Sequence, residues 1–360
     1  MRAAYGEKLR GFLAEHTNPR LLIDFSGNKI FENATVDVNI LLLEKTANAG
    51  LTESVTLEKD FRLSAENLSL YVHQHATHMT FTASESWVIL SPIEESIRRK
   101  IEAVGTPLKE WDISINYGIK TGYNEAFIIS TAKRDEILAN CQTKEERQRT
   151  EALIRPILRG KDIKRYGYDW AGLCLINTHN GIKGELPPID IALYPAIKAH
   201  LDSHWDKIAR RSDQGVTPYN LRDCAYIEDF EKPKVMWKII GCNINFCFDE
   251  KQFICNNAVN IMIGRRERLI QFVGLMNSRL FDWYLKLTTE AEVQGGGIQL
   301  YVTTLEKTLL RLDFPQNLTD IICQRINGIV SDEVVDKAIF DAYGLSIDEQ
   351  SFILQKVSRN

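Results

Sequence analysis

The chain has 360 residues, of which 44% are hydrophobic and 26% are charged, and its formal net charge at pH 7 is −4. This length allows two or three domains with sizeable cores. The longest apolar runs stop well short of the ~20 residues that a membrane span needs, so we expect no membrane association. The net charge does not suggest a nucleic-acid binder, but residues 117–240 hold 20 lysines and arginines against 17 acids. That net of +3 is compatible with a groove that faces DNA.

The seven cysteines are scattered, and the three between residues 242 and 255 form no C-x-x-C pair. An odd number of cysteines in a long chain favours free thiols in a reducing cytoplasm. No nearby histidine completes a zinc pattern. His73, His75 and His78 also lack a carboxylate or thiol that would complete a set. We interpret these histidines as surface or linker residues, and we predict no metal site.

The first elements resemble the end of a domain. Residues Tyr5–Leu13 have the spacing of an amphipathic helix, and Leu21–Phe25 and Ile30–Leu43 have the composition of strands. A helix and two strands cannot bury their own faces. We therefore expect residues 1–50 to be the truncated end of a larger α/β domain whose front is missing.

A connecting segment is expected at 51–107. Within it, Pro92–Val104 has the pattern of an amphipathic helix, which begins after Ser91 with proline at its first position. Beyond it we expect a mixed α+β domain at 108–315 and a helical, acidic tail at 316–360.

The stretch Asn116–Phe127 has the pattern of strand, glycine loop and strand. Gly118 and Gly122 are predicted to take positive φ, which glycine adopts at no steric cost. A cation, an aromatic ring and an amide on one tight loop suit contact with phosphates and base edges; these are Lys120, Tyr123 and Asn124. The alternative is an ordinary β-hairpin with a polar tip.

The segment Arg155–Arg165 carries five cations and one acid over eleven residues. A solvated helix face would intersperse more acids, so this run is a candidate for phosphate contact. The alternative is a surface loop in which Asp162 pairs with a neighbouring arginine.

Helices and strands alternate irregularly through the middle of the chain. Thr143 and Glu146 have the spacing of a capping box. The remaining expected elements are helices at Thr131–Cys141, Thr143–Leu153, Pro195–Arg211 and Arg265–Leu285, strands at Leu173–Asn177, Lys234–Ile240 and Phe253–Ile263, and loops at Thr217–Arg222 and Val293–Tyr301. This mixture predicts the α+β class.

Several of these motifs in this order resemble a known domain. They are the Gly118/Gly122 loop, Pro156–Tyr166, Tyr194–Leu201, Lys232–Trp237 and Leu275–Leu280. Together they resemble the C-terminal specificity domain of Taq-type adenine-specific DNA methyltransferases, which also ends the type IIG restriction–modification enzymes. The resemblance covers nearly the whole chain. It implies that residues 1–50 close a methyltransferase catalytic domain and that residues 108–315 recognise the target sequence.

The catalytic motifs of that family are missing. Asn18-Pro19 is followed by Arg20, so the Asn-Pro-Pro-aromatic tetrapeptide is absent, and no glycine-rich loop follows the first strand. We therefore expect no catalytic residue and no S-adenosylmethionine site in this chain, although the parent enzyme would use that cofactor. The chain is expected to be part of a longer enzyme and to work with a catalytic domain in cis or in trans.

The resemblance assigns sequence-specific recognition of double-stranded DNA for adenine-N6 methylation or restriction–modification. An alternative is a protein-interaction module or subunit without DNA binding of its own. The candidate base readers are Lys120, Tyr123, Asn124, Tyr219, Arg222, Gln294 and Gln299. The candidate phosphate contacts are Arg159, Lys161, Lys164, Arg165, Arg210, Arg211 and Lys238. In the family a phenylalanine-led strand packs on the flipped adenine, a role that falls here on Phe31.

Overall fold

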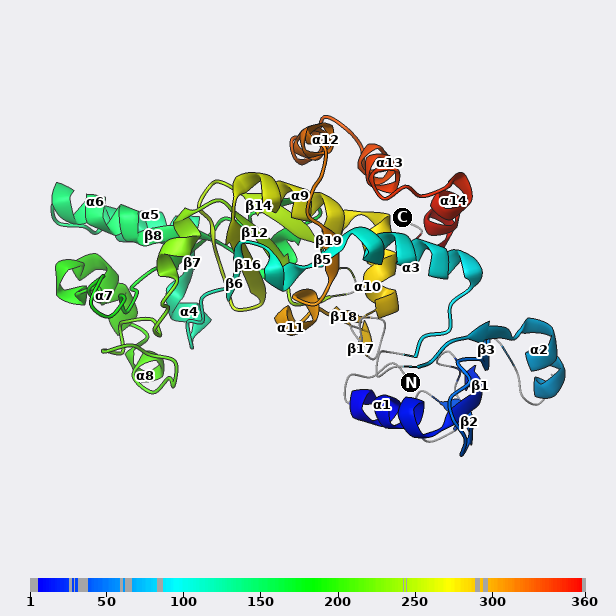
Figure 1. The fold of residues 1–360 in the computed structure, drawn as a ribbon. Helices are drawn as coiled ribbons and strands as arrows, with labels where there is room; N and C mark the ends of the chain where they lie inside the picture. Colours follow the sequence, from blue (N-terminus) through cyan, green and yellow to red (C-terminus); the bar gives the residue numbers. More distant parts are fainter. Residues whose placement is uncertain are drawn as a thin grey trace. The chain divides into compact units, whose positions relative to one another are not determined.

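The computed structural model describes residues 6–25, 28, 30–31, 38–58, 61, 67–82, 87–241, 243, 245–288, 292–293 and 297–357. The chain divides into two compact units. The first comprises Met1–Arg99 with Lys286–Glu290, and the second comprises Lys100–Leu285 with Ala291–Asn360. Each unit is described by itself (Figure 1). None of the helices in the described ranges combines the length and the apolar composition that crossing a bilayer requires.

The first unit is built on a four-stranded sheet of mixed direction, in the order β2-β1-β3-β4. Strand β1 runs antiparallel to β2 and parallel to β3. Small apolar clusters lie around Leu22 and around Ile23, consecutive residues whose side chains point to opposite faces of β1. The elements are α1 (Glu7–His16), β1 (Asn18–Asp24), β2 (Asn39–Glu44), β3 (Thr52–Thr56), α2 (Leu68–His75) and β4 (Thr77–Met79).

Two of the three clustered histidines, His73 and His75, lie in the last turn of helix α2, and His78 lies in β4. The residues that the structure describes contain no group of three His, Cys, Asp or Glu side chains placed to hold a metal ion. The six described cysteines are free thiols. Burial raises the pKa of the Cys247 and Cys255 thiols, which keeps them protonated and unreactive.

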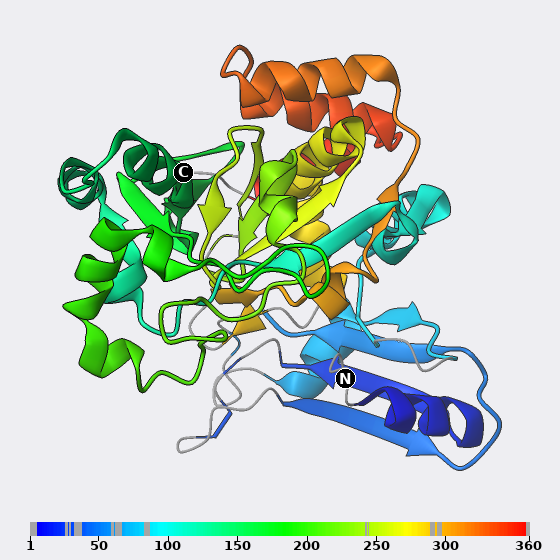
Figure 2. The same cartoon turned by 90° about the vertical axis from the view of Figure 1, so that its left-hand side faces the viewer.

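Two four-stranded sheets form the centre of the second unit (Figure 2). One has the order β15-β8-β11-β7 and the other β14-β12-β16-β6. Residues from both sheets, such as Ile157, Leu175, Met236 and Ile261, belong to one hydrophobic core. The strands are β6 (Ile113–Tyr117), β7 (Ile128–Ser130), β8 (Ile154–Leu158), β11 (Leu173–Ile176), β12 (Lys234–Lys238), β14 (Phe246–Asp249), β15 (Ile254–Cys255) and β16 (Val259–Gly264).

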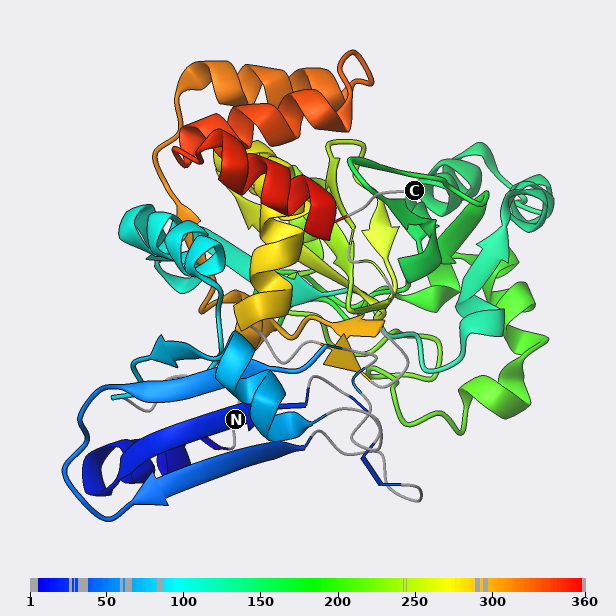
Figure 3. The ribbon, with the colours of Figure 1, turned by 90° about the vertical axis from the view of Figure 1, so that its right-hand side faces the viewer.

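Helix α9 (Arg266–Asn277) packs on the other face of the β14-β12-β16-β6 sheet. Trp237, Phe246 and Phe272 form an aromatic cluster there, with ring centroids 5.4 to 6.4 Å apart. Helix α12 (Gln316–Ile326) packs against α9 and α13 (Asp332–Ala342). Figure 3 shows α12, α13 and α14 (Ile347–Lys356) as neighbouring helices at the end of the chain.

The remaining elements include two helices that span the boundary between the units and a set of shorter helices and strands. Helices α3 (Pro92–Val104) and α10 (Arg279–Thr288) each include residues of both units. The others are α4 (Asn124–Phe127), α5 (Thr131–Ala139), α6 (Lys144–Leu153), α7 (Pro195–Asp202), α8 (Trp205–Ile208), α11 (Val302–Leu305), η2 (Leu108–Glu110), η3 (Gly160–Asp162), η4 (Ile191–Leu193), η5 (Ile227–Glu231), β5 (Gly105–Pro107), β9 (Ile163–Lys164), β10 (Gly167–Tyr168), β13 (Ile240–Gly241), β17 (Glu292–Val293), β18 (Gly297–Gln299) and β19 (Leu309–Arg311).

The α+β class is confirmed, and so are several local predictions. Helix α3 has the predicted bounds, and the Thr143 hydroxyl caps α6 by accepting from Glu146 N at 3.0 Å. Three predicted elements are interrupted instead. The helix expected at Pro195–Arg211 is two helices, and the strand expected at Phe253–Ile263 is β15, a turn and β16. The helix expected at Arg265–Leu285 breaks at Ser278, whose hydroxyl accepts from Phe281 N and so begins α10.

An ion pair is completely buried in the second unit. Lys234 Nζ lies 2.7 Å from Asp249 Oδ2, and both side chains have no exposed surface. Lys234 also donates to Phe230 O at 2.8 Å. Asp249 accepts further hydrogen bonds from Tyr168 Oη, Lys251 N and Phe253 N. Burial, and then the neighbouring Asp249 carboxylate, raise the pKa of Tyr168. Each charge is therefore both paired and hydrogen-bonded, which a buried ion pair requires.

Candidate nucleic-acid interface

The glycine loop (Gly118–Tyr123) leaves the end of β6 and leads into the short helix α4. Gly122 has φ +70°, as predicted, but Gly118 does not take positive φ. Gly118 is needed for another reason, because a Cβ there would lie 2.0 Å from Asn256 O and 2.6 Å from Cys255 O. The backbone of another segment thus approaches Gly118 too closely for any side chain. The predicted strand after the loop is also preceded by one turn of helix.

The polar loop (Asp213–Arg222) lies beside the glycine loop. Asp213 connects them, since its carboxylate contacts Lys120 Nζ at 2.9 Å and Arg222 Nη1 at 3.4 Å. The Lys120 hydrogen bond, followed by the Arg222 charge, holds the pKa of Asp213 below its usual range. Lys120 and Arg222 remain about half exposed, at 49% and 59%. The fold therefore brings together two candidate readers that lie about a hundred residues apart, and Asp213 is a site residue that sequence reasoning missed.

Asn124 and Tyr123 complete the tip of the glycine loop. Asn124 is exposed, and its Oδ1 accepts from Thr121 Oγ1 at 2.6 Å. That bond fixes which end of the amide is the acceptor and leaves the Nδ2 donor directed elsewhere. Tyr123 donates its hydroxyl to Glu125, and this hydrogen bond raises the pKa of the phenol. The tip therefore presents a cation, an oriented amide and a phenol within five residues.

Arg211 lies beneath both loops and corrects an expectation. It was a candidate phosphate contact, but only 7% of it is exposed. Its guanidinium donates to Thr121 O in the glycine loop and to the Asp213, Pro218 and Asn220 carbonyls in the polar loop. It also stacks on the Phe127 ring, 4.5 Å from the centroid. Burial lowers the pKa of Arg211 to about 10, so it stays charged at neutral pH.

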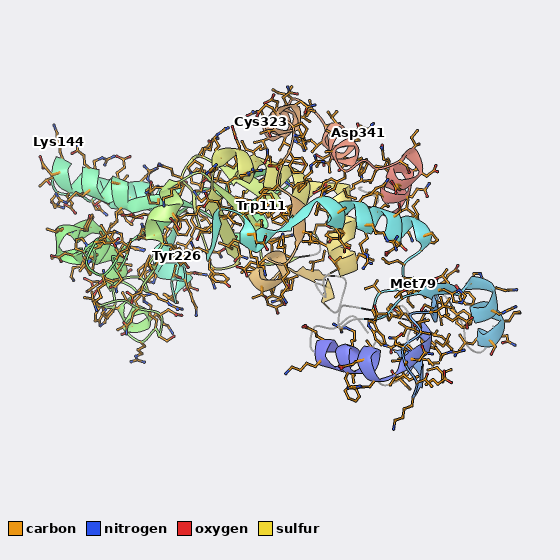
Figure 4. The ribbon with its side chains drawn as sticks, viewed as in Figure 1. Met79, Trp111, Lys144, Tyr226, Cys323 and Asp341 are labelled. Atoms are coloured by element: carbon orange, nitrogen blue, oxygen red, sulfur yellow. The ribbon has the colours of Figure 1, made fainter. Side chains whose placement is uncertain are left out.

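Tyr219 occupies the outer side of the polar loop. Its hydroxyl donates to Asp202 Oδ1 at 2.6 Å, and its ring is tilted against Trp205 with centroids 5.3 Å apart. Lys198 Nζ lies 5.4 Å from the ring centroid. Its neighbour Asn220 is 1% exposed and donates to Ile189 O, so it supports the loop rather than facing solvent. Tyr226, labelled in Figure 4, follows the polar loop in sequence and packs against the core.

Most cations of the Arg155–Arg165 run have acidic partners. Arg155 pairs with Glu231, and Arg165 pairs with Asp332 at 2.7 Å. Arg159 forms a bidentate ion pair with Asp162, in which Nε donates at 3.0 Å and Nη2 donates at 2.9 Å. The alternative for the run, an arginine held by Asp162, therefore describes Arg159.

Two lysines of the same run are less constrained. Lys164 is half exposed and its contact with Asp169 is 3.7 Å long. Lys161 is exposed, and its charge contributes to holding the pKa of the neighbouring Asp162 below its usual range. Arg210, next to the buried Arg211, is also exposed. Of the candidate phosphate contacts, Lys161, Lys164 and Arg210 are therefore the best placed to bind a DNA phosphate.

The four remaining candidates, Lys238, Gln299, Gln294 and Phe31, lie outside the glycine loop and the polar loop. A Cβ on Gly160 would lie 3.5 Å from the Lys238 Cβ, so Lys238 is beside the turn that carries Lys161. Gln299 is half-buried in β18, where it pairs with Ile240 of β13. Gln294 lies outside the described residues. Phe31, in the first unit, is 52% exposed, and the Ala34 and Val36 positions of its motif lie outside the described residues.

Two half-buried histidines form hydrogen bonds with nearby backbone groups. His179 Nδ1 accepts from Gly181 N at 3.1 Å, and His200 Nε2 lies 2.9 Å from Ala126 O at the end of the glycine-loop segment. Burial lowers the pKa of both imidazoles. Near neutral pH both are therefore neutral, with His179 protonated on Nε2 and His200 donating to the carbonyl.

We expect the melting temperature to fall as pH drops from about 7 toward 5.5. The folded-state pKa of each histidine is lower than the unfolded value of about 6.5, so the unfolded chain binds more protons below that pH. Stability is therefore fully present above about 6.5 and is lost as pH falls. Differential scanning calorimetry should show this trend, and the double variant His179→Gln, His200→Gln should flatten it. An equally steep trend in that variant would assign the effect to other groups.

In the described part of the first unit, the residue that matches the start of the catalytic tetrapeptide does not face a cofactor or base site. Asn18, the asparagine that precedes a proline, is 5% exposed in β1, and its Oδ1 accepts from Ala49 N at 3.1 Å. This side chain serves the fold, and Arg20 replaces the second proline of the catalytic tetrapeptide. Gly295 and Gly296 of the glycine run lie outside the described residues. We derive no step through S-adenosylmethionine.

Comparison with known proteins agrees with the resemblance. Residues 155–308 match the TaqI-like C-terminal specificity domain family. The chain is 25% identical over 376 residues to the type II methyltransferase M.BstVI of Geobacillus stearothermophilus, covering 97% of this chain and 63% of that protein. It is 21% identical to the type II methyltransferase M.PaeR7I of Pseudomonas aeruginosa, covering 98% and 61%. The chain thus spans about three fifths of the length of these relatives.

One solved structure is similar in fold, and a second matches just below that level. The type IIL restriction–modification enzyme MmeI in complex with DNA matches with a TM-score of 0.50 and 13% identity, over 94% of this chain and 45% of that one. The type IIG restriction endonuclease BpuSI matches with a TM-score of 0.49 and 13% identity, over 98% and 44%. The recognition of a specificity domain from the sequence is confirmed by the family match.

Proposed function

We propose that this chain, whose residues 155–308 match the TaqI-like C-terminal specificity domain, recognises a specific sequence in double-stranded DNA. It would do so for an adenine-N6 DNA methyltransferase or a type IIG restriction–modification enzyme. One observation carries the proposal: Lys120, Asn124 and Arg222 come together on two exposed loops that a single buried arginine holds. MmeI, which is similar to this chain in fold, has been solved in complex with DNA.

The chemistry of these side chains fits the major groove. Arginine and lysine donate to O6 and N7 of guanine, and asparagine matches N6 and N7 of adenine. Asp213 holds Lys120 and Arg222 in place before DNA arrives and can also accept from N4 of cytosine. A rigid, pre-positioned set of donors reads base edges with little ordering cost.

The phosphate backbone would be held by the exposed cations around these loops. Lys161, Lys164 and Arg210 are the best placed of the predicted set, with the half-buried Lys238 beside the turn that carries Lys161. Arg159 and Arg165 are already paired with Asp162 and Asp332. Such contacts position the duplex without reading its sequence.

Methylation of a base inside a duplex requires that the base be flipped out, so one domain performs chemistry while another grips the DNA. We assign this chain the second task and no cofactor of its own, with a catalytic domain in cis or in trans as its partner and the cytoplasm as its location. The exposed Phe31 ring is available for packing on the flipped adenine in that assembly. Loading of S-adenosylmethionine would then depend on the catalytic partner.

We expect the chain to bind duplex DNA with an affinity that falls steeply between about 50 and 200 mM salt. Each phosphate contact contributes roughly 0.9 to the slope of log affinity against log salt. The double variant Lys161→Ala, Lys164→Ala should reduce the slope by about 1.8. Fluorescence anisotropy of a labelled duplex measures both quantities.

Lys337→Ala provides a matched control. Lys337 is 62% exposed on α13, pairs with Asp341 and belongs to none of the clusters described above. Its replacement should leave the slope unchanged. A wild-type chain that shows no salt-dependent binding of the duplex even at about 50 mM salt would contradict DNA recognition and favour a protein-interaction module. If the double variant has the same slope as the wild type, these two lysines do not contact DNA phosphates, and the proposal of DNA recognition is otherwise unaffected.

A further inference from the structure

The asparagine turn (Asn256–Ala258) joins β15 to β16 and lies between the two groups of candidate DNA contacts. On one side it meets the glycine loop, where Asn256 forms a bridge with Ile119 and its carbonyl approaches Gly118. On the other side Ala258 O lies 3.5 Å from the Cβ that Gly160 would carry. The turn is thus flanked by the segment that carries Lys120 and by the segment that carries Lys161. The turn interrupts the strand expected at Phe253–Ile263.

The backbone of this turn is firmly held. Asn256 N donates to Leu158 O at 3.1 Å, and Asn257 N donates to Ile119 O at 3.0 Å. Ala258 O accepts from Ile239 N at 3.1 Å, and Val259 N closes the turn onto Asn256 O at 3.0 Å. The turn is therefore bonded to both four-stranded sheets and to the glycine loop. A side chain on such a support is presented in one direction, which base recognition requires.

Asn257 is the exposed polar side chain at the centre of this support. Its backbone φ is not positive, so the turn does not demand asparagine at this position. Its amide makes no hydrogen bond to any residue that the structure describes. The turn that carries it lies between the segment of Lys120 and the segment of Lys161.

We propose that Asn257 is a specificity-determining residue that contacts the N6 and N7 edge of an adenine in the recognised sequence. This inference rests on the proposed function and adds a third reading element to the glycine loop and the polar loop. The asparagine amide offers one donor and one acceptor at the spacing of that adenine edge. Because the turn is fixed to the glycine loop, Asn257 reads a base pair adjacent to those that Lys120 and Asn124 contact.

The test is selection from a random duplex library with the purified chain at low salt, followed by sequencing of the bound fraction. The wild type should enrich a motif that contains an adenine with a preference of roughly 5- to 150-fold, the range for a good two-pronged contact. Asn257→Ala should flatten the preference at that one position and keep the others. Asn257→Asp should move the preference there toward cytosine, whose N4 amino group donates to a carboxylate.

Asn327→Ala is the control, because Asn327 is an exposed asparagine at the end of α12 and not in the turn. Melting temperatures of the Asn257 variants should match the wild type, since the Asn257 amide makes no hydrogen bond to the residues that the structure describes. Asn327→Ala can lower its own melting temperature slightly, because it removes the bond from Asn327 Nδ2 to Cys323 O at 2.9 Å. If Asn257→Ala enriches the wild-type motif at every position, Asn257 is not a reader while DNA recognition stands. If the wild type enriches no motif, both the proposed function and this inference are overturned.

Discussion

Lys234→Ala is expected to lower the free energy of unfolding by about 3–5 kcal/mol, because it leaves the Asp249 carboxylate charged and buried without its cation. The two groups lie 2.7 Å apart with no exposed surface. The hydrogen bonds that Asp249 accepts from Tyr168, Lys251 and Phe253 remain, but they come from neutral donors. Urea denaturation monitored by tryptophan fluorescence measures the loss.

The double variant Lys234→Met, Asp249→Asn tests the reason for that loss. It removes both charges, and the asparagine oxygen can still accept from the backbone N–H groups. A buried ion pair that is replaced as a pair commonly costs little, whereas removal of one partner is severe. The double variant should therefore be more stable than Lys234→Ala. If both variants lose the same stability, packing rather than the uncompensated charge is the cause.

Arg211→Met is expected to abolish sequence selection and to lower stability by about 3 kcal/mol or more, because hydrogen bonds from a charged donor are worth about 1.5–3 kcal/mol each. Four backbone carbonyls in two loops lose their shared donor. The glycine loop and the polar loop would then move independently, so Lys120 and Arg222 would lose their fixed spacing. Arg211→Lys should rescue little, since an ammonium group lacks the planar fork that serves both loops.

Arg210→Met is the matched control for this variant. Arg210 is the adjacent residue and is exposed, so its replacement should weaken binding evenly across sequences and leave the motif intact. Library selection should be done at a temperature where circular dichroism shows each variant folded. A folded Arg211→Met protein that still enriches the wild-type motif would show that Arg211 serves stability alone.

The local part of this fold could be predicted from the sequence. Pro92–Val104 has a proline at its first position and a regular apolar spacing, and the helix has those bounds. Thr143 with Glu146 indicated a helix start, and the hydroxyl makes that bond. Such signals depend only on residues within one turn of each other. The break at Ser278 was missed because an apolar spacing continued through it.

The site could be predicted only in pieces. Lys120 and Arg222 were both candidates, but nothing in the sequence indicated that they share Asp213. Neighbouring arginines 210 and 211 have the same local signal, and only packing decides that one is exposed and the other buried. Lys234 and Lys232 differ in the same way, with 0% and 57% of the side chain exposed. Tertiary contacts over long sequence separations determine these outcomes, and one sequence alone does not contain them.

The position of Asp213 has a consequence for how the protein would search DNA. Lys120 and Arg222 already form ion pairs with Asp213. Exchanging this carboxylate for a DNA phosphate would therefore gain them little electrostatic free energy. Attachment to arbitrary sequence would then rest on the outer lysines, which hold the duplex loosely and allow sliding. A correct base edge supplies directional acceptors as well as charge, and it would draw the two cations away from Asp213. The acid thereby shortens the dwell time on wrong sites and makes commitment conditional on a match.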